Sequence, residues 1–465
     1  MALSEAGDRA ASLNALAPAE HYYSEALALT DGDGRGELLF RLGRVRYGRH
    51  YTGVEELQEA QDSFLAAGKN DEAAEAALML ADIAWNAGNR EELLSHMAAA
   101  RSFVEGAPRS RAQASVLAEL SRYEMLADHN DNAVEFGRQT LDLAGELGLD
   151  DLRSRALNNI GCARVALGDP GGLDDLEESI AIAVRLDAIA DVVRGYNNIA
   201  AQHVILGNLD KAREAMMESV RVAERYGLYG FLRFSAGGPR LGDHYHRGLW
   251  DEVLAGADAY LAADKGGSPD YQTASAYLFR AVIRLARGDA EGAQSDAQRG
   301  VDSARPAQDP QIFMTAVSMA TLVRLSCGDE ARAAELLDEA FTGLRELRQL
   351  SFATVWSHAL AWVAWKLGRG EEFLEIVREE PLDSPWVRAA RAMAVGDFAT
   401  AADIMGAIGA ASQEALFRLW AAEQLVDEGR RVEADEQLRR ALAFHRSVGA
   451  TRYVREGEAL LAASA

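Results

Sequence analysis

Cysteine and proline are scarce in this sequence, and both shortages narrow the classes of protein it can belong to. The two cysteines among 465 residues, Cys162 and Cys327, lie far apart and outside any CxxC or CxxH pattern. A disulfide framework or a structural zinc site is therefore not expected, and both thiols are predicted to be buried. Only nine prolines interrupt the chain, and no stretch of eighteen apolar residues is free of charges, so no membrane-spanning helix is predicted.

Basic residues are the minority among the charged ones. The chain has 48 lysines and arginines against 72 aspartates and glutamates, a net charge of −24, and it contains no basic run. A phosphate-binding surface needs clustered lysine and arginine, so neither nucleic acid nor an anionic membrane is an expected partner. The acidic start MALSEAGDRA has neither the basic nor the apolar segment of a signal peptide, so a cytoplasmic location is expected.

Catalytic signatures are missing as well. The sequence contains no HExxH, GxSxG or GxxxxGK[ST] motif and no cysteine–histidine set with catalytic spacing. Among 72 carboxylates many pairs occur by chance, so we assign no acid–base pair. The sequence therefore predicts a protein that is not an enzyme and that has no catalytic residue and no cofactor.

A tandem repeat fills the chain instead. Each copy has a residue that ends one helix, usually glycine, then a polar cap residue and an amphipathic helix, as in LGNLDKAREAMMESVRVAERYG (206–227). The spacing of these markers is close to 40 residues up to Gly368 and falls to 28 and 33 beyond it. Regular spacing of this kind is the signature of stacked helical hairpins. The marker residues are Gly48, Gly88, His129, Gly168, Gly207, Gly248, Gly288, Gly328, Gly368, Gly396 and Gly429.

Each copy is predicted to form two helices that pack against each other. The marker glycine suits the left-handed position after a helix, and the Asp or Asn beside it can cap the next helix. The stretch GDPGGLDDLEES (168–179) is one of these turns, and it lacks the basic residue that a phosphate cradle needs. No run alternates in the manner of a strand, so the predicted fold class is all-α. Small residues recur where the helices should cross: Gly161, Ala200, Ala212, Ala293, Ala333, Ala401 and Ala434.

The repeat resembles the tetratricopeptide (TPR) family. A small residue such as Ala200 is followed by glycine seven residues later, at Gly207, and by alanine five residues further on, at Ala212. The usual TPR period is about 34 residues, so a period of 40 predicts longer helices or larger loops. The resemblance implies a right-handed α-solenoid of about eleven helical hairpins with a concave groove. We expect residues 1–380 to form this array, and residues 381–465 to continue it as shorter C-terminal repeats.

Three segments are similar to a narrower group of proteins. Residues 5–29, 155–183 and 439–465 resemble the C-terminal TPR region of actinobacterial multidomain regulators. Those regulators combine an AAA/STAND ATPase with an adenylate cyclase or LuxR-type output domain. The resemblance implies a regulatory sensor or interaction module, with such an ATPase or output domain as a possible protein partner. This chain has no ATPase loop, cyclase carboxylate pair or helix-turn-helix motif of its own, so we expect an excised module or a stand-alone relative.

The segments RALNNIG and RGYNNIA hold the main candidate site. They place arginine and asparagine at matching positions of the first helices of two successive repeats, which line the groove in TPR proteins. An amide can bond both the N–H and the C=O of an extended peptide, and arginine can bind a carboxylate. The alternative is a ladder of asparagines between repeats, with the arginines paired to nearby acids. The candidate residues are Arg155, Asn158, Asn159, Arg194, Asn197 and Asn198.

A second candidate lies in FLRFSAGGPRLGDHYHRGLWDEV (231–253). Two glycines and Pro239 should break the first helix of this repeat, so a ligand pocket with Arg233 and Tyr245 as contacts is possible there. His244 and His246 diverge by about 200° on a helix, so no metal site is expected. The sequence favours a module that binds a peptide or protein segment. The alternative is a sensor domain of a STAND-type regulator that binds a small-molecule inducer.

The tryptophans of VWSHALAWVAWKLG are the last candidates. Trp356, Trp362 and Trp365 follow one another at spacings of six and three residues. This spacing is typical of the core-facing side of a helix, and the alternative is an apolar lining of the groove. A deep closed pocket around residues 233–246 would favour a small-molecule ligand, whereas an open strip from Arg155 to Asn197 would favour a peptide.

Overall fold

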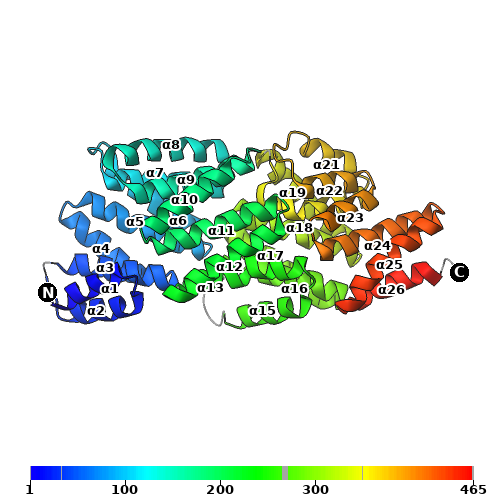
Figure 1. Ribbon diagram of the computed structural model, residues 1–465, viewed down its shortest axis with the longest axis horizontal. Helices are drawn as coiled ribbons and strands as arrows, with labels where there is room; N and C mark the ends of the chain where they lie inside the picture. The colour runs from blue at the N-terminus through cyan, green and yellow to red at the C-terminus, as the bar shows by residue number, and fades with distance from the viewer. Residues whose placement is uncertain (1, 33, 264–270, 348, 463–465) are drawn as a thin grey trace. The chain divides into compact units, whose positions relative to one another are not determined.

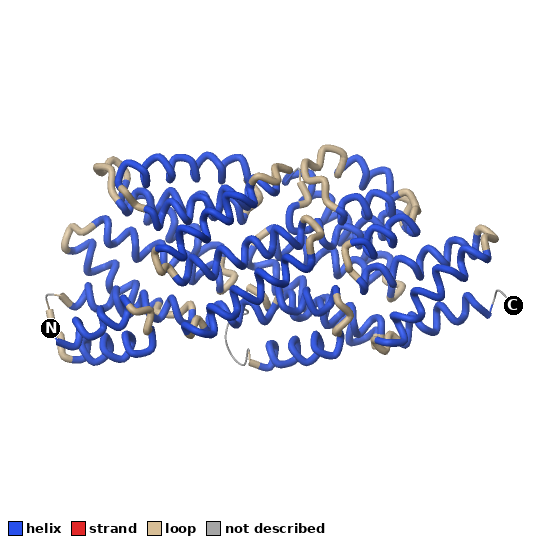
Figure 2. The backbone as a smooth tube through the Cα atoms, in the orientation of Figure 1, coloured by secondary structure: helices blue, strands red, loops and turns tan. Residues whose placement is uncertain are grey.

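The computed structural model describes residues 2–32, 34–263, 271–347 and 349–462. Over these residues the chain has 26 α-helices, two 3-10 helices and no strand, as Figures 1 and 2 show. The prediction of an all-α fold is therefore confirmed. Within the same residues, no helix is both long enough and apolar enough to span a bilayer.

The helices follow one another with short turns between them. Those up to the break near residue 238 are α1 (Ala2–Ser12), α2 (Leu16–Ala28), α3 (Arg35–His50), α4 (Val54–Ala66), α5 (Asn70–Asn86), α6 (Arg90–Val104), α7 (Arg111–Leu126), α8 (Asn130–Leu147), α9 (Asp150–Ala166), α10 (Gly172–Arg185), α11 (Ile189–Ile205), α12 (Leu209–Tyr226) and α13 (Tyr229–Gly237). Those after it are α14 (Pro239–His246), α15 (Trp250–Ala262), α16 (Thr273–Ala286), α17 (Ala290–Ala304), η1 (Arg305–Ala307), α18 (Pro310–Ser326), α19 (Glu330–Leu347), η2 (Ser351–Trp356), α20 (Ser357–Lys366), α21 (Gly370–Ile376), α22 (Pro385–Ala394), α23 (Phe398–Ala407), α24 (Ala411–Asp427), α25 (Arg431–Ser447) and α26 (Thr451–Ala462).

Helix length explains the repeat period. The helices α5, α9, α11 and α18 have 17 residues each, and α8, α12 and α19 have 18. Two helices of this length and two short turns account for a period near 40. After Gly368, α21 has 7 residues and α22 and α23 have 10 each, which accounts for the shorter spacings there.

Nine of the eleven marker residues end a helix with the left-handed backbone that the sequence predicts, φ lying between 68° and 88°. The prediction is wrong at Gly48, because α3 continues to His50 and Tyr51 adopts the left-handed conformation instead. It is displaced by one residue at His129, because Asp128 has the positive φ, 63°. Aspartate tolerates this conformation better than most residues, and Asp128 lies exactly 40 residues from both Gly88 and Gly168.

Contacts divide the chain into two compact units. Unit 1 comprises Met1–Ala200 and Glu214–Ser235, and unit 2 comprises Ala201–Arg213 and Ala236–Ala465. One division falls beside the predicted break in the chain, where α13 ends at Gly237 and α14 begins at Pro239. Proline is favoured at the first position of a helix because its missing N–H has no helical partner there. The sequence also predicts a boundary at residue 381, where the repeats become shorter. That boundary stays a prediction.

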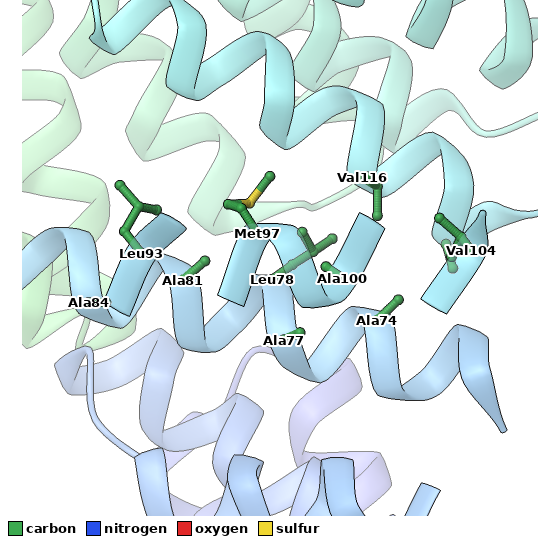
Figure 3. Packing of buried hydrophobic residues seen from close by; sticks show 11 residues of the cluster. Ala74, Ala77, Leu78, Ala81, Ala84, Leu93, Met97, Ala100, Val104 and Val116 are labelled. Carbon is green, nitrogen blue, oxygen red and sulfur yellow. The ribbon is translucent and has the colours of Figure 1, made fainter. Parts of the chain in front are cut away.

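Small side chains allow the paired helices to pack closely. Figure 3 shows this in unit 1, where alanines of α5 such as Ala77 and Ala81 meet Leu93 and Met97 of α6 in one buried cluster. All seven small residues predicted at helix crossings are buried. At Gly161 a Cβ atom would lie 2.6 Å from the carbonyl oxygen of Gly172, so α9 and α10 could not approach as closely with a larger residue there.

Unit 1 brings its first helices against its last. The ring of His50 stacks on Tyr229 with centroids 5.4 Å apart and planes 13° from parallel. Tyr51 packs against the apolar cluster of α11, α12 and α13. The Asn14 Nδ2 donates to the backbone carbonyl and the carboxylate of Asp187, at 3.2 and 3.1 Å, in an exposed position. We call these contacts of Asn14, His50 and Tyr51 the seam of unit 1.

Unit 2 also brings early residues against late ones, through buried hydrogen bonds. We call these bonds the seam of unit 2: Trp386 Nε1 donates to the Val204 carbonyl at 2.7 Å, Trp250 Nε1 donates to Ser412 Oγ at 2.9 Å, and His246 Nδ1 lies 3.1 Å from Gln413 Oε1. The side chains that form them are at most 5% exposed. The two seams therefore differ in their access to water.

Candidate functional site

Polar side chains on the first helices of unit 1 contact their counterparts in the next repeat. Four such pairs lie exactly 40 residues apart: Ser115 with Glu75 (2.9 Å), Arg122 with Asp82 (2.6 Å), Arg111 with Asp151 (3.1 Å) and Asn198 with Asn158 (2.6 Å). We define the polar strip of unit 1 as the following side chains on α3, α5, α7, α9 and α11 or directly after α3: Tyr47, Tyr51, Glu75, Asp82, Ser115, Glu119, Arg122, Tyr123, Arg155, Asn158, Asn159, Asp191, Arg194, Asn197 and Asn198.

Arg122 is held on several sides. Its guanidinium lies 5.3 Å from the ring centroid of Trp85 and 5.4 Å from that of Tyr123. It forms ion pairs with Asp82 at 2.6 Å and with Glu119 at 3.2 Å. Burial is the largest single influence on the pKa of Arg122 and lowers it, but Asp82, Tyr123, Glu119 and Tyr47 together outweigh burial, and the pKa lies well above the ordinary value. The guanidinium therefore stays charged and fixed in place.

Three tyrosines surround this charged pair. The Tyr47 hydroxyl donates to Asp82, and the rings of Tyr47 and Tyr51 lie 5.9 Å apart. Burial raises the pKa of Tyr47, Tyr51 and Tyr123, and the Asp82 carboxylate raises each of them further. All three phenols consequently keep their protons and can donate hydrogen bonds at any physiological pH.

The predicted site residues Arg155 and Arg194 share one carboxylate. The Oδ1 of Asp191 lies 3.1 Å from Arg155 Nε and 3.4 Å from Arg194 Nη2. The Asp191 charge raises the pKa of Arg155, against the opposing effect of burial. The two arginine side chains remain 35% and 21% exposed. The pairing with a nearby acid agrees with the structural alternative for these arginines, while ligand contact stays a prediction.

The four asparagines fall into two kinds. Asn158 and Asn159 are 1% exposed, and Asn159 Nδ2 donates to the carbonyl of Ala118 at 2.9 Å, which fastens α9 to α7. Asn198 Nδ2 donates to Asn158 Oδ1 at 2.6 Å, so an amide contact does join the two repeats. It involves Asn198 rather than the predicted Asn197, which bonds only weakly to Asn198, at 3.4 Å. Asn197 and Asn198 are half-buried and more accessible than the other pair.

Several polar atoms of the strip are buried without a hydrogen-bond partner. They are the Tyr123 hydroxyl, the Arg194 Nε, the Asn158 Nδ2 and the Asn159 Oδ1. Most buried polar groups in proteins are paired, because an unmade bond costs about 1–3 kcal/mol. Unused donors and acceptors thus occur on three first helices of unit 1, α7, α9 and α11.

The second candidate site does not have the expected form. Arg233 is half-buried on α13 in unit 1, whereas Tyr245 is 5% exposed on α14 in unit 2. The Tyr245 ring packs among aromatic side chains, with ring centroids 6.1 Å from Trp250 and 5.6 Å from Trp356. A cavity beside it, also lined by His445 and Tyr453, measures about 10 Å³. That volume holds about one water molecule.

The tryptophans have the burial expected of core residues. Trp356 is 4% exposed and Trp362 is 6% exposed, while Trp365 is half-buried. Trp362 stacks on Trp420, with ring centroids 4.5 Å apart and planes 11° from parallel. These contacts agree with the core prediction rather than with an open apolar lining.

The histidines and cysteines show no arrangement for a metal. His246 faces Gln413, and the described part of the chain contains no group of three or more His, Cys, Asp and Glu side chains that could hold an ion. Cys162 is buried as expected, but Cys327 is half-buried at the end of α18, so the prediction of a fully buried thiol is wrong there.

Sequence reasoning missed the centre of the polar strip. Asp82 and Arg122 each lie six residues before a left-handed marker, Gly88 and Asp128, so counting back equally in successive repeats would have found opposite charges 40 residues apart. Tyr47, Tyr51 and Tyr123 do not recur at equal positions of successive repeats. Their proximity depends on the rotation between successive repeats of unit 1, which the sequence pattern does not give.

Comparisons with known proteins identify a fold. No protein-family model and no curated protein matches the chain. Among solved structures, it is similar to a Rap protein complexed with competence and sporulation factor, with 14% identity and a TM-score of 0.51, over 72% of this chain and 98% of that one. The yeast Tom70 structure gives 14% identity and a TM-score of 0.30, over 100% of this chain and 96% of that one. At such identities the likeness to the Rap protein shows the fold alone, and the chain is a TPR-like α-solenoid.

Proposed function

We propose that this chain is a non-catalytic interaction and sensor module that binds a peptide or protein segment along the polar strip of unit 1. The observation that carries the proposal is the set of unused buried hydrogen-bonding atoms on Tyr123, Asn158, Asn159 and Arg194. A peptide backbone offers alternating donors and acceptors, which such a surface can satisfy. The Rap protein of similar fold, complexed with competence and sporulation factor, provides a precedent for a partner on this architecture.

The strip is suited to hydrogen bonding more than to charge attraction. Its four carboxylates face three guanidiniums, and most of these already form ion pairs with one another: Glu75, Asp82, Glu119 and Asp191 against Arg122, Arg155 and Arg194. A rigid site of this kind binds with a low cost of reorganisation. Arg155, Arg194, Asn197 and Asn198 are among its half-buried members and form the proposed contact set.

The regulatory context is part of the same proposal. The three segments similar to actinobacterial multidomain regulators support a role for the array in a signalling or transcriptional regulator. Its protein partner would then be the ATPase or the output domain of such a regulator. The alternative, an inducer-binding domain, finds no support at Tyr245, because the cavity there holds only about one water molecule.

A peptide array tests the proposed function. Random peptides would be screened with the full chain, and bound sequences measured by fluorescence anisotropy. Arg155→Gln/Arg194→Gln should weaken binding at least tenfold, because hydrogen bonds to charged groups contribute about 1.5–3 kcal/mol each. The matched control is Arg138→Gln/Arg185→Gln, which changes exposed arginines on the second helices α8 and α10. Equal affinity in both double variants would refute binding along the strip.

A further inference from the structure

Residues with an unusual backbone gather at the seam of unit 1. In the described part of the chain five residues other than glycine have a left-handed backbone, and three of them lie in this seam: Asn14 (φ 53°), Tyr51 (φ 55°) and Asp187 (φ 53°). Each follows the end of a helix, a position where glycine adopts this backbone most readily. Residues held in such a backbone cluster at ligand clamps and switch regions.

The side chains at these three positions make the contacts of the seam. The Asn14 Nδ2 donates to the carbonyl and the carboxylate of Asp187 across 173 residues of chain. The Tyr51 ring packs against the apolar cluster of α11, α12 and α13. Glycine would end the same helices but has no side chain to reach across the seam. The three residues therefore hold unit 1 closed despite their less favourable backbone.

One end of α13 lies close to the charged centre of the polar strip, the ion pair of Asp82 and Arg122. The Arg122 guanidinium lies 5.3 Å from the ring centroid of Trp85, and that ring lies 6.3 Å from the ring of Phe234 on α13. The side chains of Asp82 and Arg122 are only 7% and 12% exposed. A molecule from solvent can therefore bind this ion pair only if the rings around it move away.

The other end of α13 packs on the end of α3. The rings of His50 and Tyr229 stack, and a Cβ atom at Gly230 would lie 2.7 Å from the Tyr51 ring. The Tyr51 ring lies 5.9 Å from that of Tyr47, whose hydroxyl donates to the carboxylate of the ion pair. The helix α13 thus contacts both the seam and the neighbours of the charged centre, so separation at the seam would uncover that centre.

We propose that the seam of unit 1 is a gate, which opens to admit a ligand to the Asp82–Arg122 centre of the strip. The gate is suited to opening, because the Asn14 bond and the His50 stack are exposed and water competes with both. A ligand that binds the strip better when the seam is open shifts the population toward the open state. This inference rests on the proposed function and specifies how access to its site is regulated.

A paramagnetic probe measures the gate without any peptide. The full chain is labelled with 5-fluorotryptophan, and fluorine NMR measures the relaxation of each ring by the neutral nitroxide TEMPOL. Trp85 is the one tryptophan of unit 1, and the six of unit 2 are internal controls. Asn14→Ala/His50→Ala removes two exposed seam contacts and should raise the relaxation of Trp85 at least about twofold, because the open population increases.

A matched variant removes the same kinds of side chain elsewhere in unit 1. His129 Nδ1 lies 2.9 Å from Glu124 Oε2, and the Asn132 Nδ2 donates to the same oxygen at 3.1 Å, both in exposed positions outside the seam. His129→Ala/Asn132→Ala should therefore leave the relaxation of Trp85 as it is in wild type. Trp85→Phe assigns the resonance, and unchanged resonances of the other six tryptophans show that unit 2 remains folded.

A covalent link tests the gate in the opposite direction. His50→Cys/Tyr229→Cys is joined by a short bismaleimide, in a Cys327→Ser background that removes the half-buried thiol. Linking should lower the relaxation of Trp85 below that of the same variant before linking. Equal relaxation of Trp85 in wild type, in Asn14→Ala/His50→Ala and in the linked form would overturn the gate and leave the proposed function intact. Failure of the proposed function would instead appear as absence of peptide binding, on which this probe does not depend.

Discussion

Both units close on themselves, but different side chains fill them. In unit 1 the first helices present tyrosines, arginines, acids and amides, several with unused hydrogen-bonding atoms. In unit 2 the corresponding region is filled by stacked rings, such as Tyr245 on Trp250 and Trp362 on Trp420. Packing of rings dominates the interior of unit 2, although Trp362 Nε1 and both ring nitrogens of His445 are buried there without a hydrogen-bond partner. Ion pairs and hydrogen bonds dominate the first helices of unit 1.

The seams also differ between the two units, in how much their contacts are exposed to water. The seam of unit 2 consists of buried hydrogen bonds and includes Trp386, which is 1% exposed. The seam of unit 1 includes an exposed amide contact of Asn14 and a stack of two exposed rings, His50 and Tyr229. Water competes with exposed contacts, so unit 1 should open at a lower free energy than unit 2. Unit 1 thus has the more exposed closure, while buried polar atoms without a hydrogen-bond partner occur in both units.

The largest expected effect breaks the seam of unit 2. Trp386→Ala removes a fully buried indole and one of the two donors to the Val204 carbonyl, which also accepts from the Gly207 N–H, so it should cost about 3–5 kcal/mol. Six of the seven tryptophans lie in unit 2, so urea unfolding followed by fluorescence reports on that unit. Val432→Ala, at a site 85% exposed, is the control and should have no effect. If Trp386→Ala accelerated hydrogen exchange equally in both units, the two units would not unfold independently.

Acid should also weaken unit 2 more than unit 1. Burial lowers the pKa of His358 to about 3 and that of His445 to about 4, from an unfolded value of about 6.5. Below pH 6.5 the unfolded state therefore binds protons that the folded state does not bind. The free energy of unfolding is highest above pH 6.5 and falls as the pH decreases toward the folded-state pKa values. At pH 5 the loss is about 2 kcal/mol for each histidine.

Urea midpoints at pH 7, 6 and 5 measure this loss. His445→Leu should remove only part of the slope, because burial also lowers the pKa of four other histidines of unit 2: His203, His244, His246 and His358. His129→Gln, on the exposed surface of unit 1, should leave the slope unchanged. Unit 1 should respond less, because His21, His50 and His129 are exposed there and His96 is half-buried. A steeper pH response of unit 1 in hydrogen exchange would reverse the comparison.

A smaller effect is expected at the seam of unit 1. A Cβ atom at Gly230 would lie 2.7 Å from the Tyr51 ring and 3.0 Å from the backbone of His50. Gly230→Val should therefore push the seam apart, at a cost of about 1–3 kcal/mol, and accelerate amide exchange in residues 46–51 and 229–234. Gly145→Ala, a helical position with no atom near the added Cβ, should instead be neutral or stabilising. Unchanged exchange at the seam in Gly230→Val would show that these contacts do not close unit 1.

The smallest effect separates the two kinds of asparagine. Asn159→Ala removes the buried hydrogen bond that its amide donates to the Ala118 carbonyl and should lower the free energy of unfolding by about 1–2 kcal/mol. Asn197→Ala removes only a long bond and should change it by less than about 0.5 kcal/mol. Urea unfolding monitored by circular dichroism gives both values. Equal destabilisation by the two variants would mean that Asn197 is as structural as Asn159.

The repeat was predictable because it depends on local rules. Left-handed glycines and capping residues determine where helices end, and the period follows from counting them. The two failures, at Gly48 and His129, arose where a residue other than glycine adopts the left-handed backbone, Tyr51 and Asp128. Such a residue has no distinctive sequence signal, because its conformation is imposed by the helices on either side.

The candidate site was only partly predictable. Arg155 and Arg194 were found because they recur at one period within first helices, and Tyr245 was chosen for its neighbourhood to a helix break. The tyrosines of the strip could not be found in this way, since Tyr51 meets α11 across about 140 residues of chain. Each repeat is rotated slightly relative to the one before it, and contacts between distant repeats depend on the total rotation. No short segment of sequence determines that total.

The pairs spaced 40 residues apart restrict how this array can change its length. A side chain that touches its own counterpart in the next repeat meets an identical residue whenever a repeat is copied. Duplicating the repeat that carries Asp82 would place two carboxylates against each other, whereas a contact between amides, such as that of Asn158 and Asn198, survives copying. The opposite charges of Asp82 and Arg122 thus oppose duplication of their repeats, whereas the asparagine contact does not oppose it.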